Sequence, residues 1–330
     1  MVTTPRVHPP FERPNAMKKT LLSLSILLAT GLSLAQEVKV GIGISGWTGF
    51  APLTLAKESG IFKKNGLDVS IKKIPQKDRH LAIASGDIQC AATTVETWIA
   101  WNANGVATTQ IFQLDKSFGA DGMVVKPNIA SIKDLKGKKV AADAPGTATY
   151  FTLAWMLKKN GMSIKDVEVV NLSPQAGANA MIAGTAGLDA AMTYEPFLSA
   201  VRAKPEAGKI IATTLDYPMV MDTFGCTPKF LTDNPKAAKA LADGYFEALE
   251  MIAKEPKKSF EVMGADVKQS GEQFEASQKY LRWQDRAANL KFFSGEHAAF
   301  SKEAADLLLE VGIIRSLPDM SKLADTRFLR

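Results

Sequence analysis

The sequence is poor in the residues from which metal sites and catalytic triads are built. It holds three histidines and two cysteines in 330 residues. Beyond residue 35 only His80 and His297 remain, and their separation does not match metal-ligand spacing. The same shortage weighs against a Ser/His/Asp set, and no Gly-x-Ser-x-Gly turn occurs. We therefore expect a protein that is not an enzyme and that carries no metal and no cofactor.

The two cysteines are Cys90 and Cys226, both in strand-like segments. Neither follows a leader sequence directly, so a lipid-anchored cysteine is not predicted. An exported protein could join the two in a disulfide. Buried free thiols are the interpretation that the sequence favours, and the bridge stays open as the alternative.

Long apolar runs are also scarce, and the one from Leu21 to Leu34 is shorter than the roughly 20 residues of a membrane-spanning helix. It lies within Met17–Ala35, after two lysines and before Ser33-Leu34-Ala35. Basic residues, a short apolar core and small residues at the end are typical of an export signal. We predict that residues 1–35 are a leader and signal peptide and that the mature protein is periplasmic or otherwise extracytoplasmic. Whether translation begins at Met1 or Met17 stays open.

Charge gives little sign of a nucleic-acid partner. The formal net charge is +6. The first 35 residues hold four basic residues and one acidic residue, which leaves +3 for the mature chain. Its basic residues are scattered among acids, as in a solvated face, so no nucleic-acid binding is predicted. Length and 46% apolar content fit two globular domains, and we expect a monomer.

Strand-like and helix-like patterns alternate along the chain, which predicts an α/β protein with largely parallel sheets. The sequence from Pro235 onward is mostly helical in pattern. The expected strands are 38–44, 67–74, 88–92, 111–114, 122–125, 139–142, 167–171, 188–192, 209–213 and 220–224.

One glycine pattern imitates a dinucleotide-binding turn. Gly41, Gly43 and Gly46 have the right spacing, and Asp68 stands where the ribose acid would be. In that motif the helix begins directly after the strand. Here apolar alternation continues to Ile44, and several residues separate it from the next helix. We therefore reject dinucleotide binding.

Several stretches in series resemble one family, the periplasmic solute-binding proteins of the nitrate/sulfonate/taurine/thiamine-pyrimidine class of ABC importers. They are 52–69, 84–88, 132–140 and 188–196. The resemblance implies the two-lobe periplasmic-binding-protein fold of type II, with a ligand cleft between lobes and a membrane-embedded ABC permease as partner. It implies lobe 1 at 36–123 plus 224–330, lobe 2 at 124–223, and hinge crossovers near 122–125 and 222–225.

Ligands of open parallel sheets bind beyond the carboxyl ends of the strands. Those ends and the return crossover give the predicted ligand-binding residues Trp47, Thr48, Thr93, Thr94, Glu96, Asp121, Thr147, Thr149, Tyr150, Tyr194, Glu195 and Asp222. Asp115, Ser117 and Asp143 also follow strands. Glu195, between Tyr194 and Pro196, is the strongest candidate for an acid that faces the cleft.

Most of these residues have a structural alternative. Thr93 or Thr94 could cap the next helix with Glu96 as partner, and Thr147 or Thr149 could do the same. Trp47 could be a core residue. Asp143 could cap a turn. Asp115 and Asp121 could be surface groups or groups that pack at the hinge.

Acids dominate the strand ends, and Lys116 is the one base counted among them. This favours a small ligand that bears an amine, amidine or guanidinium, and an aminosulfonate such as taurine also fits. The alternatives are nitrate or an alkanesulfonate, a thiamine pyrimidine, and an exported α/β enzyme. A thiamine-pyrimidine synthase with a sacrificial histidine is disfavoured, because a leader is present and no histidine lies near a strand end.

Overall fold

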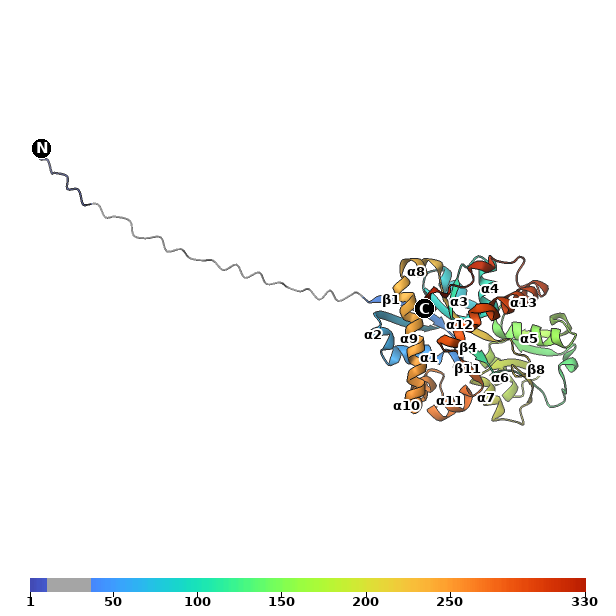
Figure 1. Ribbon diagram of the computed structural model, residues 1–330. Helices are drawn as coiled ribbons and strands as arrows, with labels where there is room; N and C mark the ends of the chain where they lie inside the picture. Colours follow the sequence, from blue (N-terminus) through green and yellow to red (C-terminus); the bar gives the residue numbers. More distant parts are fainter. Residues whose placement is uncertain (11–36) are drawn as a thin grey trace. The chain divides into compact units, whose positions relative to one another are not determined.

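A computed structural model describes residues 1–10 and 37–330. The chain divides into two units, 1–35 and 36–330. Residues 1–10 are exposed and form neither helix nor strand. The predicted signal peptide falls on 17–35, outside the described residues. The fold below is that of the second unit (Figure 1). No helix within the described ranges is long and apolar enough to cross a membrane.

Two sheets organise this unit. The first has the order β11-β4-β10-β3-β1-β2 and the second the order β7-β6-β8-β5-β9. The strands of the first are β1 (Val38–Ile44), β2 (Leu67–Lys73), β3 (Cys90–Thr94), β4 (Thr109–Ser117), β10 (Met221–Cys226) and β11 (Leu281–Trp283). Those of the second are β5 (Asp121–Val125), β6 (Lys139–Ala142), β7 (Glu168–Asn171), β8 (Ala190–Tyr194) and β9 (Lys209–Thr213).

Parallel pairing joins β1 to β2 and β3, and β6 to β7 and β8. The strands β10 and β5 run antiparallel to both of their neighbours. These are the strands by which the chain enters each sheet from the other. The predicted α/β class is confirmed, with antiparallel strands where the chain changes sheet.

Helices surround both sheets (Figure 1). They are α1 (Ala51–Glu58), α2 (Ile61–Lys64), α3 (Gln76–Ala84), α4 (Val95–Ala103), α5 (Ala148–Lys159), α6 (Pro174–Ile182), α7 (Phe197–Arg202), α8 (Pro228–Asp233), α9 (Pro235–Lys254), α10 (Pro256–Asp266), α11 (Gly271–Gln278), α12 (Arg286–Lys291) and α13 (His297–Glu310). Proline opens α8, α9 and α10, where its fixed φ suits the first helical turn.

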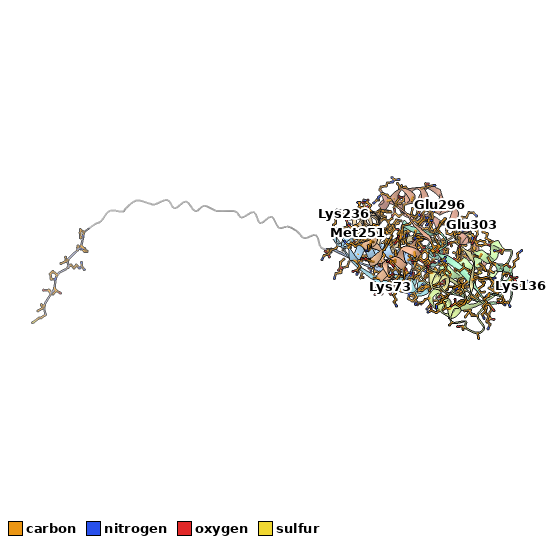
Figure 2. The ribbon with its side chains drawn as sticks, turned by 90° about the horizontal axis from the view of Figure 1, so that it is seen from below. Lys73, Lys136, Lys236, Met251, Glu296 and Glu303 are labelled. Carbon is orange, nitrogen blue, oxygen red and sulfur yellow. A yellow bond between two sulfur atoms is a disulfide. The ribbon has the colours of Figure 1, made fainter. Side chains whose placement is uncertain are left out.

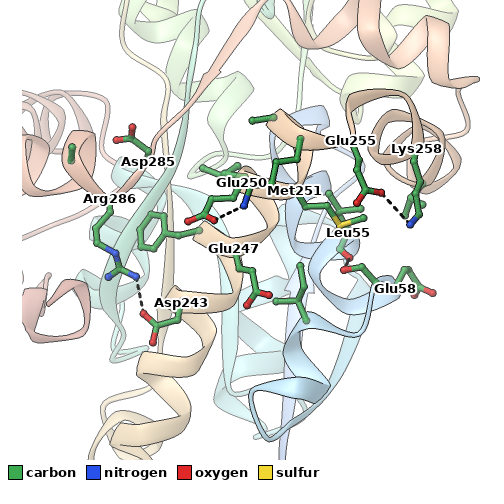
Figure 3. Close-up of a pocket in the computed structure, with 18 residues that line it drawn as sticks. Leu55, Glu58, Asp243, Glu247, Glu250, Met251, Glu255, Lys258, Asp285 and Arg286 are labelled. Carbon is green, nitrogen blue, oxygen red and sulfur yellow. Dashed lines mark hydrogen bonds and ion pairs between the residues drawn. The ribbon is translucent and has the colours of Figure 1, made fainter.

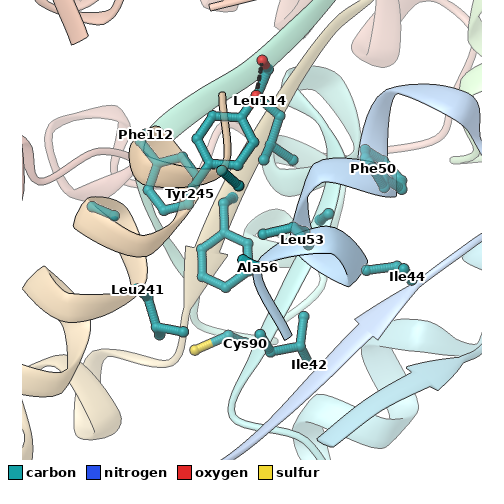
Figure 4. Close-up of a cluster of buried hydrophobic side chains, with 14 of the residues drawn as sticks. Ile42, Ile44, Phe50, Leu53, Ala56, Cys90, Phe112, Leu114, Leu241 and Tyr245 are labelled. Carbon is teal, nitrogen blue, oxygen red and sulfur yellow. Dashed lines mark hydrogen bonds between the residues drawn. The ribbon is translucent and has the colours of Figure 1, made fainter. Parts of the chain in front are cut away.

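The core of the first sheet packs β4 and β10 against α9 (Figure 4). The Phe112 ring stacks on Phe224 and on Tyr245, with centroids 4.8 and 5.1 Å away. The Tyr245 hydroxyl donates to the Leu114 carbonyl. Burial of each aromatic ring stabilises the fold by roughly 1.5–3 kcal/mol. This packing fixes the end of β4, where Asp115 follows Leu114.

A second core lies around β6 and β8, and it continues into α4 and α13. Phe151 of α5, Ile99 of α4 and Leu307 of α13 belong to the same buried cluster. The C-terminal helix therefore packs against helices associated with both sheets. The lobe boundaries stay a prediction.

Two short segments connect the sheets. The first is 118–120, between β4 and β5, and the second is 214–220, between β9 and β10. They are held together by a hydrogen bond from the Gly119 amide to the Thr214 hydroxyl, at 2.8 Å. The sequence placed the hinge crossovers near 122–125 and 222–225, and these residues lie in β5 and β10, the strands that directly follow the two connecting segments. The hinge itself stays a prediction.

Two glycines in these strands allow close packing. A Cβ on Gly225 would lie 2.7 Å from the Thr109 carbonyl oxygen, so the neighbouring backbone requires glycine there. A Cβ on Gly122 would lie 2.9 Å from Leu198 Cδ2, so the leucine side chain would have to shift.

Cys90 of β3 and Cys226 of β10 form a disulfide, so the favoured interpretation of free thiols is wrong. The two residues are direct partners in the antiparallel pairing of β3 with β10. They are 136 residues apart in sequence. Only the return of the chain to the first sheet brings them together.

Strand ends differ from the prediction by two residues at two places that matter. β3 ends at Thr94 and β8 ends at Tyr194. The predicted strands end at residues 92 and 192. Thr93, Thr94 and Tyr194 are therefore the last residues of their strands and do not lie in the loops that follow. β1 continues to Ile44, and α1 begins only at Ala51, which confirms the rejection of a dinucleotide turn.

Candidate functional site

A small pocket lies where the ends of strands from both sheets meet. Its lining residues are Ser45, Trp47, Phe50, Gln76, Arg79, Thr93, Thr94, Asp121, Ala148, Tyr194, Val220 and Asp222. Its volume is about 20 Å³. One ordered water needs roughly 10–15 Å³ by the same kind of measure, so this space suits only a very small ligand unless the walls move apart.

Half of the predicted ligand-binding residues line this pocket. They are Trp47, Thr93, Thr94, Asp121, Tyr194 and Asp222. The Trp47 and Tyr194 rings meet edge to face, with centroids 5.5 Å apart and planes at 82°. Trp47 is therefore both packed and at the pocket wall. The strand-end rule gathers these residues from both sheets, and their role in binding stays a prediction.

The threonines near α5 shape its first turn and are outside the pocket. The Thr147 hydroxyl donates to the Ala144 carbonyl at 2.8 Å. The Thr149 hydroxyl accepts from the Asp143 amide at 3.1 Å. Tyr150 is partly exposed and does not belong to the lining. A ligand-binding role is thus unsupported for Thr147, Thr149 and Tyr150.

Glu195 does not face the pocket, contrary to the prediction. It is fully buried in an ion pair with Arg202 and accepts from the Ser199 amide at 3.1 Å. Arg202 also donates to the Gly119 carbonyl at 2.9 Å. The helix α7 begins just after Glu195, and its last residue, Arg202, lies about two helical turns later on the side that contacts Glu195. Thr48 is also buried outside the lining, and its amide donates to the Glu195 carbonyl at 3.4 Å.

Four buried acids gather at one side of the pocket. Asp121 and Asp222 line it, and Asp115 and Glu96 lie directly behind. Asp222 pairs in register with Thr94 on one side and with Asp115 on the other, so the three residues form a row across the first sheet. Cross-strand partners lie about 4.5–5.5 Å apart. The row brings the Asp115 and Asp222 carboxyl groups close enough for the ionisation of each to affect the other.

Burial is the main cause of unusual pKa values in this cluster. It raises the pKa of Glu96 to about 8 and that of Asp121 to about 7. It also raises the pKa of Asp115 and Asp222 well above the usual range, and neighbouring carboxylates add to both shifts. Burial therefore favours the neutral forms of these acids, and a cation in the pocket would favour their ionised forms.

Glu96 does not act as a capping partner of Thr93 or Thr94, because the first turn of α4 has no side-chain cap hydrogen bond. The Thr94 hydroxyl is within 2.8 Å of the Thr97 hydroxyl. The Glu96 side chain is 2% exposed, and its Oε2 has no hydrogen-bond partner among the described residues. An unpartnered carboxyl oxygen next to Asp121 and Asp222 is a costly arrangement for folding alone. It fits a group that responds to a ligand.

Arg79 is the residue that sequence reasoning missed. Its side chain is 1% exposed, and its guanidinium donates to the carbonyls of Ile74 and Ala92. Burial lowers its pKa to about 10, so it stays cationic at neutral pH. The claim that no base except Lys116 stands near the strand ends is wrong. Gly43 leaves room for this side chain, since a Cβ there would lie 3.0 Å from Arg79 Cγ.

A signal for Arg79 and Gln76 was present in the sequence. The segment after β2 was not counted among the strand ends. Gln76 opens α3 directly after that strand, and Arg79 follows one turn later on the same helix face. The strand-end rule applied to β2 would have pointed to both.

A much larger hollow lies elsewhere, between α1, α9, α10 and α12 (Figure 3), with a volume of about 1080 Å³. Its charges are largely matched by ion pairs. These pairs are Arg286 with Asp243, Lys254 with Glu250, and Lys258 with Glu255, at 2.7, 3.2 and 3.3 Å. An open groove of paired surface charges lacks the convergent buried groups of a ligand site.

Figure 2 labels Lys73 and Glu303, two exposed charged residues that are also in ion pairs. Lys73 bonds Asp266 at 2.7 Å, and Glu303 accepts from Lys159 at 2.9 Å. Such exposed pairs contribute little to stability. Within residues 1–10 and 37–330, no group of three or more His, Cys, Asp or Glu side chains is arranged to hold a metal ion.

A family model described as "NMT1/THI5 like" matches residues 47–259, which include most of both sheets. The chain belongs to the NMT1/THI5-like family. The match begins at Trp47 and contains every lining residue except Ser45.

Several curated relatives of this family member are named as binding proteins, and one, from Haemophilus influenzae and 28% identical over 163 residues, is named for thiamine biosynthesis. The taurine-binding periplasmic protein of Escherichia coli is 26% identical over 239 residues, which are 70% of this chain and 72% of the relative. A candidate binding protein of Brucella abortus is 24% identical over 260 residues, 76% and 79% of the two chains. The resemblance seen in the sequence is thereby confirmed.

Solved structures confirm the periplasmic-binding-protein fold. The alkanesulfonate-binding protein of Xanthomonas axonopodis pv. citri, bound to MOPS, has a TM-score of 0.74 and 17% identity, over 88% of this chain and all of that one. A desulfurization enzyme has a TM-score of 0.63 and 13% identity, over 88% and 97% of the two chains. The fold alone thus serves both binding proteins and an enzyme.

Proposed function

We propose that this chain is the extracytoplasmic solute-binding component of an ABC importer and that it captures a small ligand bearing an amine or guanidinium group. Family membership and the taurine-binding relative support the general role. A membrane-embedded permease is then its partner. The ligand chemistry is argued from the pocket.

The observation that carries this proposal is the buried acid cluster. Asp121 and Asp222 face the pocket, with Asp115 and Glu96 behind them. A cationic group there gains charge-assisted hydrogen bonds of about 1.5–3 kcal/mol each. The Trp47 and Tyr194 rings add cation–π attraction of roughly 0.5–2 kcal/mol. A bare anion gains no such ion pair from these acids, and any of them that is ionised would repel it.

Arg79 narrows the ligand class. Its bonds to Ile74 and Ala92 engage Nε, Nη1 and Nη2 once each. A guanidinium has five N–H groups, so donors remain for an anionic group in the pocket. A zwitterion suits one guanidinium opposite several acids better than a bare cation does. An aminosulfonate such as taurine is therefore the favoured ligand, and the walls of the pocket must move apart to admit it.

We further propose that capture closes the cleft between two lobes, 36–123 plus 224–330 and 124–223. The connecting segments 118–120 and 214–220 would be the hinge. Lining residues from both sheets support this, because a ligand that touches both lobes favours the closed form.

Calorimetric titration with matched probes tests the ligand class. Taurine carries both charges, ethanesulfonate lacks the amine, and ethylamine lacks the sulfonate; guanidinium and nitrate complete the set. We expect taurine to bind most tightly and Asp222→Asn to weaken amines more than ethanesulfonate. Arg79→Lys should weaken taurine more than ethylamine. Tight binding of nitrate or ethanesulfonate, with no binding of any amine, would overturn the proposal.

A further inference from the structure

A second cavity adjoins the pocket and is much larger, with a volume of about 310 Å³. Its lining includes Lys77, His80 and Trp101 on one side and Gly146 and Thr147 on the other. Among the described residues, Gln76 alone lines both cavities. The inner pocket and the outer cavity therefore meet at one side chain.

The Gln76 carboxamide is fixed at both of its ends. Its Nε2 donates to the hydroxyls of Thr93 and Thr97, at 2.8 and 2.9 Å. Its Oε1 accepts from the Ala148 amide at 3.2 Å. That amide belongs to the first turn of α5, where no partner within the helix is available. Gln76 thus joins α3, β3 and α4 to the start of α5.

The position of Gln76 relative to Arg79 relates it to one end of the ligand. The two residues are three apart on α3, so their side chains lie on the same helix face. If Arg79 receives the anionic group, that end of the ligand lies next to Gln76. A ligand with a longer chain would press its anionic end against the Gln76 carboxamide. Beyond it stand His80 and Lys77, which is paired with Asp78 at 3.0 Å.

We propose that Gln76 determines the length of ligand that this protein accepts. It closes the inner pocket with a hydrogen-bonded carboxamide, and its removal joins the 20 Å³ pocket to the 310 Å³ cavity. This inference rests on the proposed function, because it places the ligand in the inner pocket.

Two variants separate filling of space from hydrogen bonding. Gln76→Ala removes the partition, whereas Gln76→Met keeps a side chain of similar length and loses the three hydrogen bonds. Wild type and both variants are titrated with taurine, 3-aminopropanesulfonate and 4-aminobutanesulfonate. Circular dichroism melting shows that each variant is folded.

In wild type we expect each added methylene to weaken binding by about tenfold or more. In Gln76→Ala the three probes should bind with similar affinity, or the longest should bind most tightly. The affinity for 4-aminobutanesulfonate should then be about tenfold higher than in wild type. Gln76→Met should keep the wild-type order with weaker binding throughout. Retention of the wild-type order by Gln76→Ala would overturn the inference.

The two proposals fail in distinguishable ways. Wild type that binds no amine contradicts the proposed function. A crystal structure of Gln76→Ala tests the inference without any ligand, because the two cavities should then be continuous. A separate inner pocket in that structure would contradict the role of Gln76, whatever wild type binds.

Discussion

The indole Nε1 of Trp47 donates to both carboxylate oxygens of Asp115, at 3.2 and 3.3 Å. Asp115 is outside the pocket lining, whereas Trp47 is part of it. Gly49 makes this contact possible, since a Cβ there would lie under 3.0 Å from both the indole nitrogen and an Asp115 oxygen. Asp115, which does not line the pocket, thus holds in place the Trp47 ring, which does.

Gly49→Ala is therefore expected to separate Trp47 from Asp115. The added methyl overpacks a buried contact, and such changes cost roughly 1–3 kcal/mol of unfolding free energy. Urea unfolding and taurine titration measure the two effects. Gly46→Ala is the matched control in the same loop, because a Cβ there meets no described atom within 4 Å. Equal stability and affinity in the two variants would contradict this account.

Glu96→Gln should reduce the dependence of stability on pH. Burial raises the pKa of Glu96 from 4.5 to about 8, so the folded state favours the neutral acid. Its stabilising contribution is complete below about pH 4.5. As pH rises, the glutamate of the unfolded chain ionises first, and the contribution is lost by about pH 8.

Urea unfolding without added ligand, at about pH 5 and about pH 8, measures how the free energy of unfolding changes with pH. The free energy of unfolding should fall more with pH in wild type than in Glu96→Gln. The exposed Glu275→Gln is the control and should behave as wild type. A slope unchanged by Glu96→Gln would show that this carboxyl ionises freely in the folded protein.

Glu195→Gln should affect stability and leave ligand preference unchanged. The substitution removes the ion pair with Arg202, and a hydrogen bond to a charged group contributes about 1.5–3 kcal/mol. Asp222→Asn is the comparison, with the opposite result expected in taurine titration. If Glu195→Gln weakens taurine binding and unfolds like wild type, Glu195 acts in the cleft after all.

Loss of the Cys90–Cys226 disulfide should lower the free energy of unfolding by roughly 2–4 kcal/mol. The bridge joins residues 136 apart, so it restricts a long loop of the unfolded chain. Denaturant unfolding of wild type with and without reductant, beside the double variant Cys90→Ser/Cys226→Ser, measures this difference. Two reactive thiols in the denatured, unreduced protein would contradict the bridge.

Local pattern sufficed for many elements. The strands β6 and β9 have the bounds that the sequence predicted, because each is marked by its own periodicity and its own terminating residues, and the helix α9 begins at the predicted Pro235. β3 and β8 were displaced by two residues, since apolar alternation does not show where pairing stops. The short elements α8, β11 and α12 were missed for lack of a sustained period.

The amino-acid sequence by itself determined the α/β class, the family resemblance and half of the pocket wall, because the local pattern of apolar and polar residues marks a strand and its approximate end. Only the tertiary structure decided that Cys90 meets Cys226, that Glu195 turns to Arg202, and that Arg79 enters the acid cluster. Each of these depends on which strands and helices become neighbours in space. Packing of the whole unit sets that arrangement, and no local periodicity records it.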